Sequence, residues 1–156
     1  MKKIIFPVLL LLCCGLFSGC IKNLPYATTP NPSMNVTIGN YTFTTTTVYP
    51  ATVKQQVNDT SVSLVITGNE IVTREKIILT INNYKGKSGE YSIVMGQASA
   101  NYIHATGNGN ALGGNVVINK ITNDSIIGYF NFDTVDGLSL VNGTFTVPTP
   151  NYVANP

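Results

Sequence analysis

The only histidine, His104, carries the side chain best suited to proton transfer near neutral pH. A serine hydrolase would place this imidazole beside a serine and an aspartate, but the sequence contains no Gly-x-Ser-x-Gly motif. A zinc site needs three or four Cys and His ligands, and no second soft ligand lies near His104. Two carboxylates that face a cleft can hydrolyse glycosides, and Asp133 and Asp136 are a candidate pair. They precede Gly137 in a turn-forming segment, however, so we interpret them as solvated turn residues. We therefore predict no catalytic residues, no metal site and no cofactor.

Two glycine-containing segments have partial nucleotide-binding patterns. Gly86-Lys87-Ser88 matches the end of a phosphate-binding loop, but Ile81 stands where that loop requires its first glycine. In the run 107–114 the third glycine of a dinucleotide fingerprint falls on Leu112, and no helix is expected to follow. We interpret 107–114 as a mobile connection between strands. The alternative is a ligand-contact loop, whose contacts would be Tyr102, His104, Asn108 and Asn110.

The first twenty residues have the pattern of a secretory signal peptide. Two lysines precede an apolar run over 4–17, which is shorter than the roughly 20 residues of a membrane-spanning helix. Residues 16–20, Leu-Phe-Ser-Gly-Cys, resemble the lipobox of bacterial lipoproteins, although Phe17 replaces the usual aliphatic residue. The resemblance implies cleavage between Gly19 and Cys20, followed by acylation of Cys20 with chains such as palmitate.

The cysteine count agrees with lipidation. Cys13 and Cys14 leave with the signal peptide, so Cys20 is the only cysteine of the exported chain and cannot form an internal disulfide. Ile21, rather than an aspartate, follows Cys20, and among bacterial lipoproteins this implies transfer to the outer membrane. No acidic cluster follows, so the resemblance favours the periplasmic face over the cell surface.

The 156 residues divide into four segments around one domain. We predict a signal peptide over 1–19, a lipidated cysteine and proline-rich tether over 20–33, a β domain over 34–148, and a tail over 149–156. Without the signal peptide, seven Lys and Arg balance seven Asp and Glu. Binding to nucleic acid needs a basic face, so this neutral chain has no such partner.

From Met34 onward, apolar and polar residues alternate with a period of two, which is typical of half-buried strands. Gly39-Asn40 is typical of a hairpin turn with a positive φ at the glycine. We expect an all-β fold, a single antiparallel sandwich or barrel-like domain of about eight or nine short strands. The predicted strands cover 34–38, 41–48, 61–67, 76–84, 90–95, 98–104, 115–121, 125–133 and 138–147.

The segments 128–132 and 143–147 share the pattern Gly-x-Phe-x-apolar. We predict that they are neighbouring paired strands, with each glycine at a bulge or a close approach. These segments, the tether and the Ile-Gly-Asn turn resemble an uncharacterised family of small Bacteroidota lipoproteins. The resemblance implies fold and location and supplies no catalytic residue. Asp124-Ser125-Ile126 and Asp133-Thr134-Val135 are also similar to the O-glycosylation signal of those bacteria.

These patterns predict a lipid-anchored envelope protein that acts as a non-catalytic binding or accessory module for another envelope protein or a small ligand. One alternative is a lipocalin-like carrier, which would require an internal cavity lined by apolar residues. A second alternative is a hydrolase with an unrecognised site, which would require a cleft joining His104 to a serine and an aspartate. A filled core beneath an exposed apolar patch would favour the binding module.

Overall fold

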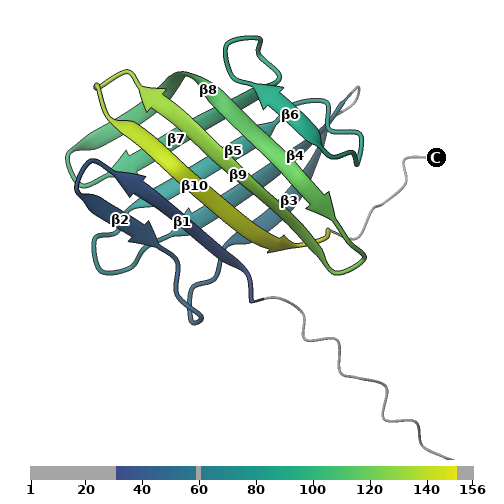
Figure 1. Cartoon of the computed structure of the whole chain (residues 1–156), viewed down its shortest axis with the longest axis horizontal. Coiled ribbons are helices and arrows are strands. Elements are labelled where there is room, and N and C mark those ends of the chain that lie inside the picture. The colour runs from purple at the N-terminus through teal and green to yellow at the C-terminus, as the bar shows by residue number, and fades with distance from the viewer. Residues whose placement is uncertain (1–30, 59–60, 151–156) are drawn as a thin grey trace, which may run out of the picture.

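A computed structural model describes residues 31–58 and 61–150, which fold into ten strands with no helix in these ranges (Figure 1). No helix in these two ranges is long and apolar enough to span a membrane. The strands are β1 (Ser33–Ile38), β2 (Tyr41–Thr44), β3 (Thr52–Asn58), β4 (Ser61–Asn69), β5 (Lys76–Ile81), β6 (Gly89–Ser92), β7 (Ala98–His104), β8 (Gly107–Ile121), β9 (Ser125–Thr134) and β10 (Ser139–Pro148).

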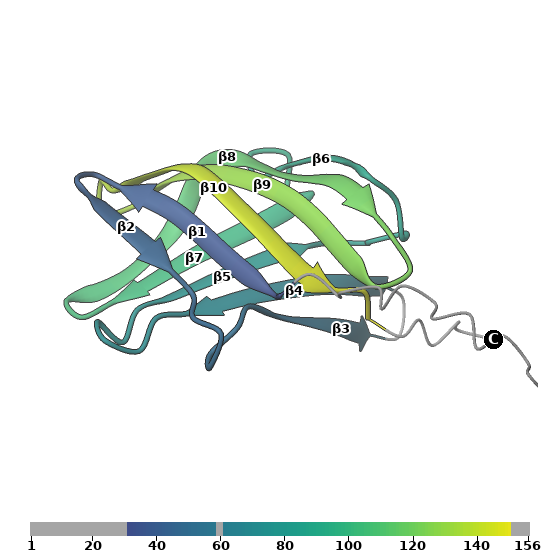
Figure 2. The ribbon, with the colours of Figure 1, turned by 60° about the horizontal axis from the view of Figure 1, so that its bottom comes forward.

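All strand pairs are antiparallel, and the order is β2-β1-β10-β9-β8-β7-β5-β4-β3, with β6 paired to β8 off this path. The sheet curls into a half-barrel whose two halves face each other. Figure 2 shows β1, β2, β9 and β10 on one side and β3, β4, β5 and β7 on the other. β8 joins the halves, because its first residues pair with β7 and its later residues pair with β9 and β6. The predicted antiparallel all-β, barrel-like fold is confirmed.

The core lies between the two halves and is made by alternate residues of each strand. On β5, for example, Ile77, Leu79 and Ile81 are fully buried, and the residues between them are not. The two Gly-x-Phe segments are neighbours, as predicted: Gly128 of β9 lies opposite Phe145 of β10, and Gly143 lies opposite Phe130. The sequence pattern therefore identified both the pairing and the close approach.

The prediction that 107–114 is a mobile connection is wrong, because these residues form the first half of β8. Glycine is needed here for packing. Gly114 has φ +121°, and a Cβ on it would overlap the carbonyl oxygen of Asn131. A Cβ on Gly109 would lie 2.6 Å from Oδ1 of Asp136. The small residues let β8 bend between the two halves of the sheet.

Four other strand predictions need correction. β2 ends at Thr44 and β5 ends at Ile81, before the predicted ends at Val48 and Tyr84. β3 was missed because it is an edge strand without a buried residue, so its alternation of polar and apolar residues is weak. β6 ends at Ser92, and the predicted continuation to Met95 is a turn. At the other predicted turn, Gly39 has φ +59°, as its place in the β1–β2 hairpin requires.

Thr45, which follows β2, forms two hydrogen bonds with Met34, the first core residue of β1. Its buried hydroxyl accepts a hydrogen bond from the Met34 N–H at 2.8 Å, and its own N–H donates to the Met34 carbonyl at 3.0 Å. Thr45→Val keeps the shape but leaves a buried N–H unpaired, so we expect the free energy of unfolding to fall by about 2 kcal/mol in urea titrations. Thr44→Val, at an exposed position, is the matched control and should change stability by less than about 0.5 kcal/mol. Equal effects of the two changes would contradict the role of Thr45.

Candidate functional site

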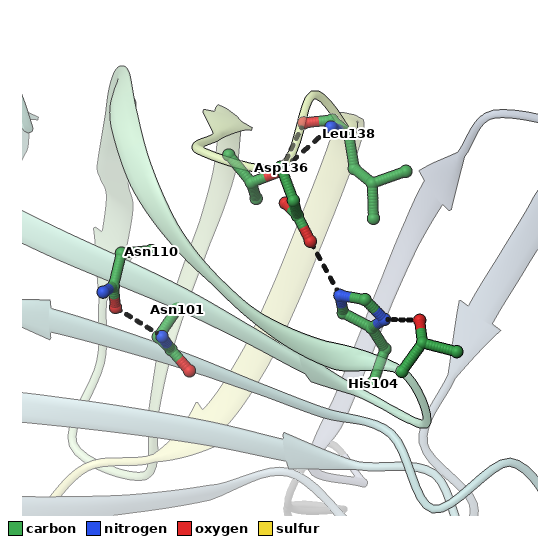
Figure 3. A network of polar contacts seen from close by, with 7 residues as sticks. Asn101, His104, Asn110, Asp136 and Leu138 are labelled. Carbon is green, nitrogen blue, oxygen red and sulfur yellow. Dashed lines mark hydrogen bonds and ion pairs between the residues drawn. The ribbon is translucent and has the colours of Figure 1, made fainter.

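The best-defined polar cluster lies where the β7–β8 hairpin meets the β9–β10 turn (Figure 3). His104, the last residue of β7, places Nε2 2.8 Å from Oδ2 of Asp136, which is 32 residues away in the chain. The other ring nitrogen, Nδ1, lies 3.0 Å from Oγ1 of Thr106. A carboxylate can only accept, so in the neutral ring Nε2 carries the proton and Nδ1 accepts from the Thr106 hydroxyl. The cluster thus joins a hydroxyl, an imidazole and a carboxylate.

The β9–β10 turn holds Asp136 in place. Thr134 closes the turn with its hydroxyl, which accepts from the Leu138 N–H and donates to the Leu138 carbonyl, both at 3.0 Å. Gly137 has φ +84°, the left-handed conformation that this tight turn requires. On the opposing strand, Gly109 leaves the space that the Asp136 carboxylate occupies. The turn sequence Thr-Val-Asp-Gly therefore aims the carboxylate at the hairpin.

Tyr102 supports the imidazole from the interior side. The two rings stack with centroids 5.0 Å apart and an interplanar angle of 25°, and Tyr102 is only 3% exposed. Burial, then a hydrogen bond to the Glu75 carboxyl, raises the pKa of Tyr102 far above its usual range, so its phenol stays protonated and can donate. The other Glu75 oxygen, Oε2, is buried without a hydrogen-bond partner among the described residues. Tyr102 therefore positions the ring and is shielded from solvent.

A shallow depression of about 380 Å³ lies beside this cluster, at the base of the β4–β5 turn. Ile71 and Ile103 give it an apolar surface, and Glu70 and Arg74 give it charges of both signs. Burial raises the pKa of Glu70, and a hydrogen bond from the Thr73 hydroxyl at 3.2 Å opposes that rise. A surface of this kind suits a weak polar contact better than an enclosed ligand.

The structure separates the four residues of the predicted ligand-contact loop. Tyr102 and His104 share one face of β7, whereas Asn108 and Asn110 lie opposite Ile103 and Asn101, which belong to the other face. Asn101 donates to Asn110 at 2.6 Å (Figure 3), so that amide pair ties β7 to β8. The sequence analysis missed Thr106 and Glu75 as partners of this region. Gly19 and Cys20, the predicted processing and lipidation site, lie outside the described residues.

Ser125 and Thr134, the two hydroxyl residues of the O-glycosylation-like motifs, are 3% and 2% exposed. The Ser125 hydroxyl lies 3.0 Å from the Thr122 hydroxyl, and the Thr134 hydroxyl closes its turn with Leu138. A glycan on either oxygen would break these contacts. The folded domain therefore does not present either motif for modification.

An exposed apolar patch occupies the outer surface near the bend of β8. It consists of three side chains that are 77%, 75% and 65% exposed, Val94, Met95 and Leu112. The turn after β6 lies against β8 beside Leu112: the Ile93 N–H donates to the Gly114 carbonyl at 2.9 Å, and a Cβ on Gly113, the residue after Leu112, would lie 3.4 Å from Val94. We refer to these three residues as the apolar patch.

Comparisons with known proteins add no assignment. The chain matches no protein-family model, no curated protein and no solved structure. Within residues 31–58 and 61–150, no group of three or more His, Cys, Asp or Glu side chains is placed to hold a metal ion.

The environment of the Asp136 carboxylate predicts a pH dependence of stability. Interaction with the Thr134 hydroxyl, and to a lesser extent the hydrogen bond from His104, lowers the pKa of Asp136 below its ordinary value of 3.8. The folded state thus favours the carboxylate, and this stabilisation is present above the ordinary pKa and is lost as pH falls through the lowered one. Burial of Glu70 acts in the opposite direction, because its raised pKa means that the folded state holds its proton more tightly.

The test compares variants rather than the total stability, since the two trends oppose each other. We expect the stability difference between the unmodified protein and Asp136→Asn to shrink as the pH is lowered from about 5 to about 2 in thermal unfolding. Asp124→Asn, which removes the same charge from the β8–β9 turn, is the control. A difference for Asp136→Asn that stays constant over this range would show that the carboxylate is not selectively stabilised in the fold.

Proposed function

We propose that the protein is a lipid-anchored, non-catalytic binding or accessory module of the bacterial envelope, held in the outer membrane through Cys20 and facing the periplasm. The N-terminal pattern that ends in Leu-Phe-Ser-Gly-Cys supports the anchor. The proposed partner is another envelope protein, which the domain would contact through its surface.

The observation that carries the binding role is the apolar patch above a filled core. Val94 and Met95 are about three-quarters exposed on a turn that the structure fixes against β8. Clustered apolar side chains on the surface of a small domain commonly mark an interaction site. Three phenylalanine side chains of the core are at most 2% exposed: Phe43, Phe130 and Phe145. They occupy the space that a lipocalin-like carrier would need for its ligand. The carrier alternative therefore has less support.

Native mass spectrometry of the acylated protein, purified from its own envelope in mild detergent, tests the proposal. We expect a stoichiometric protein partner and an intact mass that includes acyl chains on the cleaved chain starting at Cys20. A co-purifying small molecule without a protein partner would instead favour the carrier. Bare monomer would contradict a stable accessory complex, and an unacylated mass would contradict the anchor.

A hydrolase is the second candidate, and the Thr106–His104–Asp136 arrangement supports it. Nucleophilic catalysis needs a hydroxyl in contact with a base that a third group orients, and these three side chains have contacts of 3.0 Å and 2.8 Å. Thr106 is exposed at the hairpin tip, where a substrate could reach it. The test is hydrolysis of p-nitrophenyl acetate by the unmodified protein and by Thr106→Val. Equal rates for the two proteins would exclude a catalytic role of the Thr106 hydroxyl on this ester.

A further inference from the structure

The connection between β2 and β3 carries two exposed apolar side chains at its tip. Val48 is 75% exposed and Tyr49 is 50% exposed. No charged residue lies in the segment from Tyr41 to Val53, and the exposed Thr46 and Thr47 supply hydroxyl groups beside the tip. The tip therefore combines an apolar side chain, an amphipathic aromatic ring and uncharged hydrogen-bonding groups.

The structure fixes this tip next to the point where the chain enters the domain. The Thr45 N–H donates to the Met34 carbonyl at 3.0 Å, and the Thr45 hydroxyl accepts from the Met34 N–H. The tip itself is closed by a hydrogen bond of 3.2 Å from the Tyr49 N–H to the Thr46 hydroxyl. Figure 1 shows this connection at the bottom of the domain, beside the start of β1.

The length of chain before β1 limits how far the domain can lie from its anchor. Twelve residues separate Cys20 from Ser33, where β1 begins. Even fully extended, a proline-rich segment of this length spans only about 40 Å, and a flexible chain has an end-to-end distance of about 20 Å. A lipid anchored at Cys20 therefore keeps the start of β1, and the tip beside it, within reach of the bilayer surface.

We propose that the Val48–Tyr49 tip contacts the surface of the bilayer that holds the anchor, and this inference rests on the proposed lipidation of Cys20. Tyrosine is favoured at the level of lipid headgroups, because its ring is apolar and its hydroxyl is polar. Val48 adds apolar area, and the absence of charge avoids the penalty of moving an ion toward the hydrocarbon. The contact fixes the orientation of the domain as well as its distance.

This orientation directs the apolar patch away from the membrane. In both Figure 1 and Figure 2 the β2–β3 connection lies at the bottom of the domain, whereas β6 and the turn that follows it lie at the top. Met95, in that turn, is 75% exposed, the same fraction as Val48. The two positions therefore make a matched pair for a test of which side faces the lipid.

The experiment places one tryptophan at each position in turn. The chain has no tryptophan, so Val48→Trp and Met95→Trp each introduce a single emitting indole. The lipidated variants are incorporated into phosphatidylethanolamine–phosphatidylglycerol vesicles that contain brominated phospholipid. We expect Val48→Trp to emit at shorter wavelength and to be quenched at least about twofold more than Met95→Trp, as for an indole at the headgroup level. Thermal unfolding confirms that both variants are folded.

The outcomes separate this inference from the proposed function on which it rests. Vesicle flotation reports the anchor independently of fluorescence. A protein that floats while the two indoles are quenched equally, or not at all, overturns the contact and leaves the anchor in place. A protein that does not float overturns the anchor and the contact together.

Discussion

Gly128→Ala is expected to lower the free energy of unfolding by about 3 kcal/mol, at the upper end of the range for overpacked cores. A Cβ on Gly128 would overlap the Val117 carbonyl oxygen on β8 and the ring of Phe145 on β10. The backbone oxygen cannot move without breaking the β8–β9 pairing, and the ring is already 98% buried. Gly143 has the reciprocal place, since a Cβ on it would lie 2.6 Å from the Phe130 ring.

Urea unfolding of the exported chain measures the effect, and Gly96→Ala is the control. Alanine in place of Gly96 also carries a backbone penalty, because φ at this position is +70°. No atom, however, lies within 4 Å of a Cβ placed there. That change should cost only about 1 kcal/mol. If Gly128→Ala were no more destabilising than Gly96→Ala, the close contact between β9 and its two neighbours would be disproved. The comparison separates steric overlap from backbone strain.

The same glycines show why part of the fold could be predicted from sequence. Alternation with a period of two assigns the faces of a strand, and two copies of Gly-x-Phe-x-apolar indicate that each glycine must accommodate a large ring. The pairing of Gly128 with Phe145 and of Gly143 with Phe130 follows from these local rules. Such evidence lies within one hairpin, so it needs no knowledge of the rest of the molecule.

The glycine run of β8 could not be interpreted in this way. Its composition is that of a loop, and only the position of Asn131 on β9 explains why Gly114 lacks a side chain. The contact of His104 with Asp136 was equally hidden, because it spans 32 residues and depends on the register of three strands. Sequence periodicity gives the faces of strands but not which loops meet at an end of the sheet. The candidate polar cluster therefore emerged only with the tertiary structure.

The proposed anchor, the membrane-contacting tip and the apolar patch together define a direction for the domain. A tether alone would let the domain rotate freely, and the patch would then meet the bilayer as often as a partner. The proposed contact of Tyr49 with the lipid surface would restrict that rotation and would keep Leu112 available to the proposed partner. Restricting orientation raises the effective concentration of the patch toward partners anchored in the same membrane.

Leu112→Asp is therefore expected to reduce the amount of partner recovered with the acylated protein at least about tenfold, which corresponds to a loss of roughly 1.4 kcal/mol. Leu112 lies at the β8 bulge, where the register shifts between Ala111 and Gly113, and its side chain is 65% exposed. In the free domain the side chain faces solvent, so the substitution leaves the core intact. In the complex with the partner, the introduced carboxylate would be buried against apolar groups and would lose its hydration. Native mass spectrometry measures the partner per acylated chain.

Val72→Asp provides the control, because Val72 is 92% exposed on the β4–β5 turn and is not part of the apolar patch. It adds the same charge to an apolar surface position, so it should leave the recovered partner unchanged. Equal loss in both variants would indicate that net charge, rather than the patch, governs the association. Full recovery with Leu112→Asp would show that the partner binds elsewhere, and the His104–Asp136 end of the half-barrel would become the next surface to test.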